Sequence, residues 1–124
     1  MKSALMEIKN APVFEDAAEY IIAHADEYDM TEIILPEGEK QIWEACAYTI
    51  CNMPVGFIEE HALRLMAWFQ DLNWPGTEQI YAALCKLPSD VLIHALKEGI
   101  KNAENAGDEE WAYNLREEFK DWIC

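Results

Sequence analysis

Three histidines and four cysteines are the residues of this chain best suited to metal binding or nucleophilic chemistry. His24, His61 and His94 fall on three different predicted helices, so they form no local set of ligands. Their spacing from nearby glutamates does not match the Glu-x-x-His pattern of di-iron bundles. We therefore expect single histidines at helix surfaces or core edges. A Cys/His metal site assembled from distant helices is the alternative.

The cysteines form no Cys-x-x-Cys pair, and three of them lie within apolar helical patterns. They are Cys46, Cys51, Cys85 and Cys124. Four cysteines can in principle make two disulfides. For a cytoplasmic chain with a good core we expect free, buried thiols instead.

Sequence motifs for catalysis are missing. The chain contains no GxGxxG, GxxxxGK(S/T), GxSxG or HExxH. Adjacent acids such as Glu59-Glu60, Glu109-Glu110 and Glu117-Glu118 are expected on solvated helix faces, because a glycosidase needs two acids in a defined cleft. The sequence therefore predicts a protein that is not an enzyme, with no catalytic residue, no metal site and no cofactor.

The carboxylates of this chain are concentrated in one part of the sequence. Carboxylates can recognise a basic partner electrostatically. Between Asn10 and Glu39 there is no Lys or Arg. The acids of this stretch are Glu15, Asp16, Glu19, Asp26, Glu27, Asp29, Glu32, Glu37 and Glu39. Folded domains usually mix both signs of charge, and self-repulsion costs stability. We interpret the run as a surface that docks against a basic protein, with a merely solvated face as the alternative.

Charge and composition also exclude several classes of partner. A net charge of −15 argues against nucleic acid and anionic membranes. With 124 residues, of which 52% are hydrophobic, residues 1–124 are expected to form a single domain with its own core. No apolar run is long enough to span a membrane, and Glu7 interrupts the N-terminal one. We expect a cytoplasmic protein of unknown oligomeric state.

The elements that position these residues are predicted to be helices. Apolar spacing indicates helices over about 3–10, 15–28, 39–52 and 57–71, and three more begin near Pro75, Pro88 and Asp108. Residues 31–38 are expected to form an extended loop or a helical turn, with a strand as the alternative. The helix over 57–71 is expected to sit centrally, because Leu63 and Trp68 widen its apolar stripe. Gly107 is expected to close the sixth helix, and Asp108 to cap the seventh.

These expectations combine into an all-α fold. We predict a compact array of about six to seven antiparallel helices, with HEAT-like hairpins in the C-terminal half. Four of the five tryptophans lie in helical apolar stripes and are expected in the core, with a ligand cage as the alternative. Trp74, at a turn, is expected to be exposed.

Two motifs in the C-terminal half carry a family resemblance. They are Trp68-Phe69-Gln70-Asp71-Leu72-Asn73-Trp74-Pro75, followed by a helical hairpin, and Gly107-Asp108-Glu109-Glu110-Trp111. From about Phe57 onward the chain resembles a family of small uncharacterised bacterial proteins with HEAT-like helices. That family has no established catalytic residues. The resemblance implies that Asp71, Asn73 and Pro75 form a helix-to-helix turn with Trp74, and it leaves the acidic N-terminal half, up to about Pro54, uncovered.

Small acidic helical proteins of this kind are also similar to bacterial immunity proteins, which neutralise a toxin delivered by a neighbouring cell. Many such toxins are basic nucleases. The leading hypothesis is therefore an immunity-type protein whose acidic surface, from Glu15 to Glu44, binds such a nuclease. Tyr20, Tyr28 or Trp74 would serve as anchors. The alternative is a HEAT-like adaptor in which the fourth to seventh helices present a groove to a host regulatory protein.

Overall fold

A computed structural model describes residues 1–35 and 39–123 of the chain, and helices dominate it. The α-helices are α1 (Ala4–Asn10), α2 (Phe14–Ala23), α3 (Trp43–Cys51), α4 (Val55–Leu65), α5 (Thr77–Leu84), α6 (Ser89–Asn105), α7 (Glu109–Glu118) and α8 (Lys120–Ile123). Short 3-10 helices are η1 (Ala25–Glu27), η2 (Met30–Ile33), η3 (Lys40–Ile42) and η4 (Met66–Gln70). The prediction of an all-α fold is confirmed.

Two residue pairs form a minimal parallel sheet near the N-terminus. Strand β1 (Lys2–Ser3) pairs with β2 (Tyr28–Asp29), with Lys2 opposite Tyr28. This pairing explains why the second helix is shorter than the predicted range 15–28. The chain leaves α2 at His24 and turns through η1, so that Tyr28 reaches Lys2.

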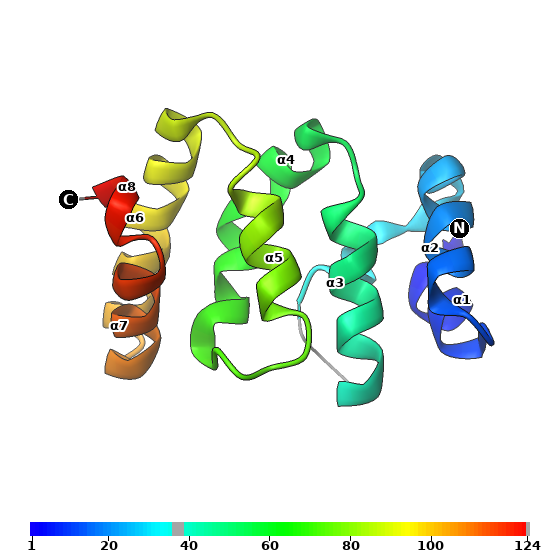
Figure 1. The fold of residues 1–124 in the computed structure, drawn as a ribbon, viewed down its shortest axis with the longest axis horizontal. Coiled ribbons are helices and arrows are strands. Elements are labelled where there is room, and N and C mark those ends of the chain that lie inside the picture. The colour runs from blue at the N-terminus through cyan, green and yellow to red at the C-terminus, as the bar shows by residue number, and fades with distance from the viewer. Residues whose placement is uncertain (36–38, 124) are drawn as a thin grey trace.

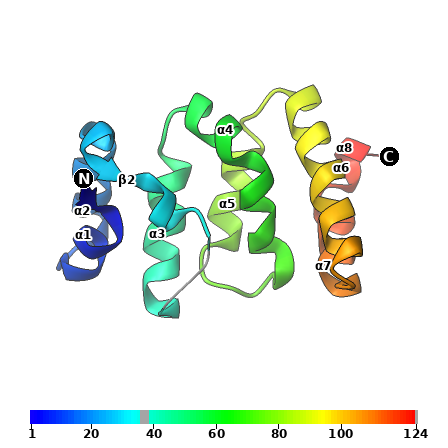
Figure 2. The ribbon, with the colours of Figure 1, turned by 180° about the vertical axis from the view of Figure 1, so that it is seen from behind.

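The helices stand side by side in two layers and run alternately in opposite directions along the chain. Helices α2, α3, α5 and α7 lie toward the viewer in Figure 1, whereas α1, α4 and α6 lie toward the viewer in Figure 2. The two termini lie at opposite ends of this row. Helix α2 packs on α1 and α3, so the acidic helix lies at the end of the array that the N-terminal elements form (Figure 1).

Buried donors tie successive elements together. Trp68 is fully buried and donates its indole N–H to the carbonyl of Ile34, at 2.8 Å. Trp111 Nε1 donates to Met66 O at 2.9 Å, and Asn114 Nδ2 donates to Phe69 O at 3.0 Å. Both acceptors lie in η4, where the helical hydrogen-bond ladder tightens and leaves carbonyls free for other donors. Helix α7 is thereby fastened to the end of α4.

The predicted helix ends are partly confirmed. Asp108 caps α7 by accepting from the N–H of Trp111, and Gly107 has the left-handed φ of 73° expected of a residue that closes α6. Pro75 does not lie in the first turn of the fifth helix, because Gly76 intervenes in a left-handed conformation before α5 begins.

Several side chains lie in surroundings that the sequence did not indicate. Leu63 was expected to widen a buried stripe, but it is 43% exposed, because the space between α4 and α6 stays open beside it. Trp74 is only partly exposed, since it packs edge-on against Trp43 with ring centroids 5.1 Å apart. In the segment 31–38, η2 confirms the helical turn as far as Ile33. Glu37 and Cys124 lie outside the described residues.

Candidate protein-binding surface

The acids at the start of the predicted docking surface share one helix. Helix α2 buries Ala17, Ala18 and Ile21 and turns its other side to solvent. Glu15, Asp16 and Glu19 are exposed there, and we call these three carboxylates the acidic face. Glu15 and Glu19 are one turn apart and point to the same side. Two of the three acids lie in the first turn, where the helix dipole stabilises negative charge.

Beside the acidic face runs a groove between α2 and α3. It encloses about 440 Å³, and the three acids line it together with Ile22, Ala23, Tyr48 and Asn52. Phe14 holds the Tyr48 ring by an edge contact at 5.6 Å between centroids. A groove with carboxylates at its rim and an aromatic ring in its wall suits an arginine or lysine side chain, which can bind both.

On its other flank the acidic face borders a larger hollow between α1 and α2. This hollow encloses about 650 Å³, and Asp16 lines both it and the groove. Three large side chains in it are exposed to solvent, namely Met6 by 50%, Val13 by 45% and Tyr20 by 45%. We call these three residues the apolar hollow. Clustered exposed apolar side chains of this kind mark interaction sites.

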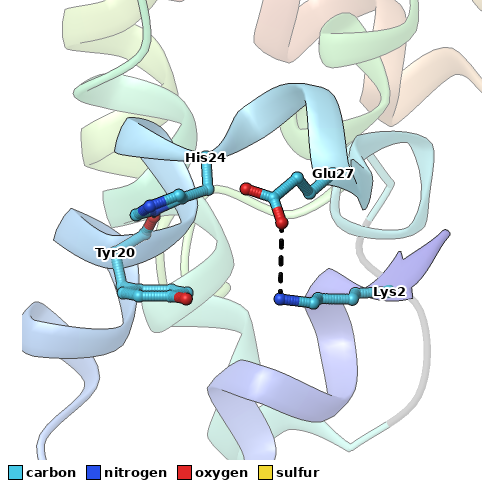
Figure 3. A network of polar contacts seen from close by, with 4 residues as sticks. All are labelled: Lys2, Tyr20, His24 and Glu27. Carbon is cyan, nitrogen blue, oxygen red and sulfur yellow. Dashed lines mark hydrogen bonds and ion pairs between the residues drawn. The ribbon is translucent and has the colours of Figure 1, made fainter.

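Several later acids of the predicted surface make contacts within the chain. Figure 3 shows Lys2 reaching Glu27 beside the stacked rings of Tyr20 and His24, and Lys2 Nζ lies 3.5 Å from Glu27 Oε1. The phenol of Tyr20 and then the carboxylate of Glu27 raise the pKa of Lys2. This ion pair fastens η1 to the N-terminal strand.

Asp29 and Glu32 have similar structural roles. Asp29 accepts from the N–H of Thr31 at 3.2 Å and so caps η2. Glu32 accepts from Ser3 Oγ at 2.9 Å and from the N–H of Leu5 at 3.4 Å, which satisfies a donor at the start of α1. Among the later acids that the structure describes, Asp26 and Glu44 are exposed and make no ion pair or side-chain hydrogen bond.

The bases of the N-terminal half do not neutralise the acidic face. Lys2 pairs with Glu27, and Lys9 pairs with Glu39 at 3.8 Å. The Lys40 ammonium lies 5.7 Å above the Trp43 ring. The three carboxylates of α2 therefore stay uncompensated among the residues that the structure describes.

Trp74 is not part of this surface. It precedes α5 and packs on Trp43, at the start of α3, whereas α2 lies on the other side of α3 (Figure 1). In the same junction Asp71 accepts from the N–H of Asn73 at 2.8 Å. The hydroxyl of Thr77 donates to the carbonyls of Trp68 and Asp71, at 3.3 Å each. The motif is a helix-to-helix turn, as the resemblance implied.

The expectation of buried thiols holds for Cys46, whereas Cys51, Cys85 and His61 are only partly buried. Cys46, Cys51 and Cys85 are free, and burial raises the pKa of Cys46 to about 12, so this thiol is not activated. Burial also lowers the pKa of His61. No cluster of possible metal ligands occurs in residues 1–35 and 39–123.

Sequence reasoning missed the apolar hollow and the groove. Met6 lies off the buried stripe of α1, which contains Ala4 and Ile8, and Val13 precedes α2. Their positions off the stripe were a usable signal, but only the packing of α1 on α2 shows that Met6, Val13 and Tyr20 line one hollow.

Comparison with known proteins identifies the family of this chain but assigns it no activity. Residues 44–123 match the family described as Domain of unknown function (DUF5071). No curated protein and no solved structure matches the chain. Within the described ranges, every helix falls short of the length and apolarity that a membrane crossing requires. Since the match covers well over half of the 124 residues, the chain belongs to the DUF5071 family.

Proposed function

We propose that this protein binds and neutralises a basic bacterial toxin of the nuclease class, and that the acidic face of α2 is its main contact. One observation carries the proposal. Three exposed carboxylates without a basic partner in the described chain stand between a groove with an aromatic wall and an apolar hollow.

This arrangement supplies both parts of a typical protein interface. Arginines or lysines of the toxin would enter the groove between Glu15, Glu19 and Tyr48. An apolar side chain of the toxin would cover Met6, Val13 and Tyr20, and exclude water from the neighbouring charges. Such charges speed the encounter of oppositely charged partners and lose that effect as salt rises. A nuclease covered in this way would lose access to its substrate phosphates.

The proposal concerns this chain and not its family as a whole. The acidic face and the apolar hollow lie between Met6 and Tyr20, outside residues 44–123. The HEAT-like adaptor remains the alternative, and it differs in a testable way, because it assigns binding to α4–α7 and leaves the acidic half only a solubilising role.

A charge-reversal experiment tests the proposal. The probe is the basic product of the gene next to that of this protein, assayed for nuclease activity and for its Kd with the inhibitor. The variant E15K/D16K/E19K should bind about 100-fold more weakly, at roughly 1 kcal/mol for each reversed charge. The matched variant E109K/E110K/D121K changes net charge equally at exposed sites on α7 and α8 and should bind within about threefold of wild type. Equal weakening by both triples would mean that net charge, and not this face, attracts the toxin.

A second pair of variants tests the apolar hollow. Tyr20→Ala should weaken binding by about 30-fold, the range of an interface hot spot. Tyr113→Ala removes a tyrosine that is also exposed, on α7, and should leave the Kd unchanged. If Tyr20→Ala bound as well as wild type, the hollow would lie outside the interface.

A further inference from the structure

A second recessed surface lies between α4 and α6, the helices that lie toward the viewer in the centre and on the right of Figure 2. This α4–α6 groove encloses about 510 Å³. Its wall is apolar where Ala62 and Leu63 of α4 lie opposite Val91 and Ala95 of α6. Leu63 stays 43% exposed although the two helices pack directly on each other. An exposed leucine in a groove is apolar surface available to a partner.

The rim of the α4–α6 groove is acidic. The carboxylates that line it are Glu59, Glu60, Asp90 and Glu98. No Lys or Arg is among the lining residues in the described part of the chain. Helices α4 and α6 both run downward in Figure 2, and along α6 Asp90 lies in the first turn, ahead of Glu98. Asp90 and Glu98 are eight residues apart, which corresponds to about 12 Å, or two turns of a helix.

None of these four acids forms an ion pair with a Lys or Arg among the described residues. The closest contact of a rim acid is Glu60 with His61 Nε2, at 4.0 Å. Burial lowers the pKa of His61, so its imidazole is predominantly neutral near pH 7. His61 does not line the groove, and His94, the one nitrogen-bearing side chain among the described lining residues, is exposed. The groove therefore presents an apolar centre with uncompensated negative charge at both ends.

We propose that the α4–α6 groove binds an amphipathic helical segment of a partner protein, in which one or two leucine-like side chains are flanked by lysines or arginines. The apolar side chains of that segment contact Leu63 and Val91. Its cations reach Asp90 at one end and Glu98 at the other. Helix-in-groove recognition uses this combination of apolar anchors and complementary charge.

The α4–α6 groove is separate from the toxin surface proposed above. It lies within residues 44–123, the part that matches the family, and on the other side of the array from the α2–α3 groove. It gives the adaptor alternative a defined surface and a defined class of ligand. Either surface can fail its own test without affecting the other.

The test uses the full chain and a helical peptide of about 14 residues, long enough to cover the groove. The peptide carries one Leu-x-x-x-Leu pair flanked by lysines, and a second peptide replaces both leucines with serine. Fluorescence anisotropy measures the Kd, and amide chemical shifts of the labelled protein locate the contact. We expect shifts at Leu63, Val91 and Ala95, and binding of the serine peptide that is at least about tenfold weaker.

Variants of the protein sharpen the result. Leu63→Ser should weaken binding of the leucine peptide by about tenfold. It should still fold, because the side chain is half exposed, and circular dichroism checks this. D90K/E98K should weaken binding by at least about tenfold, whereas E109K/E110K, with the same change in charge, should stay within about twofold.

Two outcomes would overturn the groove as a binding site. Shifts confined to α2, with affinity lost in E15K/D16K/E19K and kept in Leu63→Ser, would place the peptide on the acidic face. Equal affinity for the leucine and serine peptides would show that charge alone attracts them. Neither outcome would contradict the proposal that the acidic face binds a basic toxin.

Discussion

Replacing Gly76 with alanine tests how α3, η4 and α5 meet. Gly76 precedes α5 with φ of 100°, a left-handed conformation that L-residues rarely adopt. A Cβ atom built there would lie 2.6 Å from Ala47 Cβ, 3.0 Å from the ring of Trp68 and 3.1 Å from the carbonyl oxygen of Trp43. Gly107 also has a positive φ, of 73°, but a Cβ there would meet nothing within 4 Å. An alanine at Gly107 therefore tests the cost of the left-handed conformation alone, whereas an alanine at Gly76 adds the cost of crowding.

The expected cost follows from these two contributions. A left-handed alanine costs roughly 1–2 kcal/mol, and the stiffer unfolded chain offsets roughly 0.5 kcal/mol of it. Gly107→Ala should therefore destabilise by about 1 kcal/mol. Gly76→Ala adds overpacking against backbone and a buried ring, typically 1–3 kcal/mol, for a total of about 2–4 kcal/mol. In a domain of this size, the Tm should fall by about 3–5 °C for each kcal/mol.

Urea unfolding followed by tryptophan fluorescence and circular dichroism measures both variants. The midpoints should shift with little change in the slope m, because the surface exposed on unfolding stays the same. If Gly76→Ala lowers the free energy of unfolding by no more than Gly107→Ala, the residues around Gly76 are not close-packed. That result would contradict the close contact of α3 and η4 with the start of α5. A cost above about 5 kcal/mol would mean that Ala47, Trp68 and the Trp43 carbonyl cannot move enough to admit the added methyl group.

Further predictions concern stability and reactivity elsewhere in the chain. Gly56→Ala, in the first turn of α4 with no atom near its Cβ, should stabilise by about 0.5–1 kcal/mol in the same assay. Trp68→Phe leaves the buried carbonyl of Ile34 without its donor and should destabilise by about 2–3 kcal/mol, whereas an unchanged midpoint would contradict that hydrogen bond. Burial lowers the pKa of His61 from its ordinary 6.5, so the unfolded state binds more protons and stability falls as pH drops below 6.5; unfolding midpoints from about pH 7 to about pH 5 should fall less in His61→Gln than in wild type. Cys46, whose pKa burial raises to about 12, should be alkylated only after unfolding, so peptide mass spectrometry should find its labelling rate increasing with urea.

Local patterns in the sequence were sufficient for the class of fold and for several helix ends. Apolar side chains at helical spacing predict helices because a helix must bury one stripe, and this holds whatever packs against it. Asp108 and Gly107 were identifiable because capping uses backbone groups within a few residues. The net charge and the acidic residues of α2 could also be identified from the sequence, because they depend on composition and spacing alone.

Tertiary structure decided which of those acids are available to a partner. Glu27 and Glu32 lie in the same acidic run as Glu19, but their partners are Lys2 and Ser3, more than twenty residues away in the chain. No local pattern predicts these pairs, because they form only when η1 and η2 pack against the N-terminal strand and α1. The exposure of Leu63 was undecided in the same way. The exposure of Leu63 depends on how closely α6 approaches α4. A stripe of hydrophobic residues predicts that a helix has a buried face, but it does not predict the distance to the neighbouring helix.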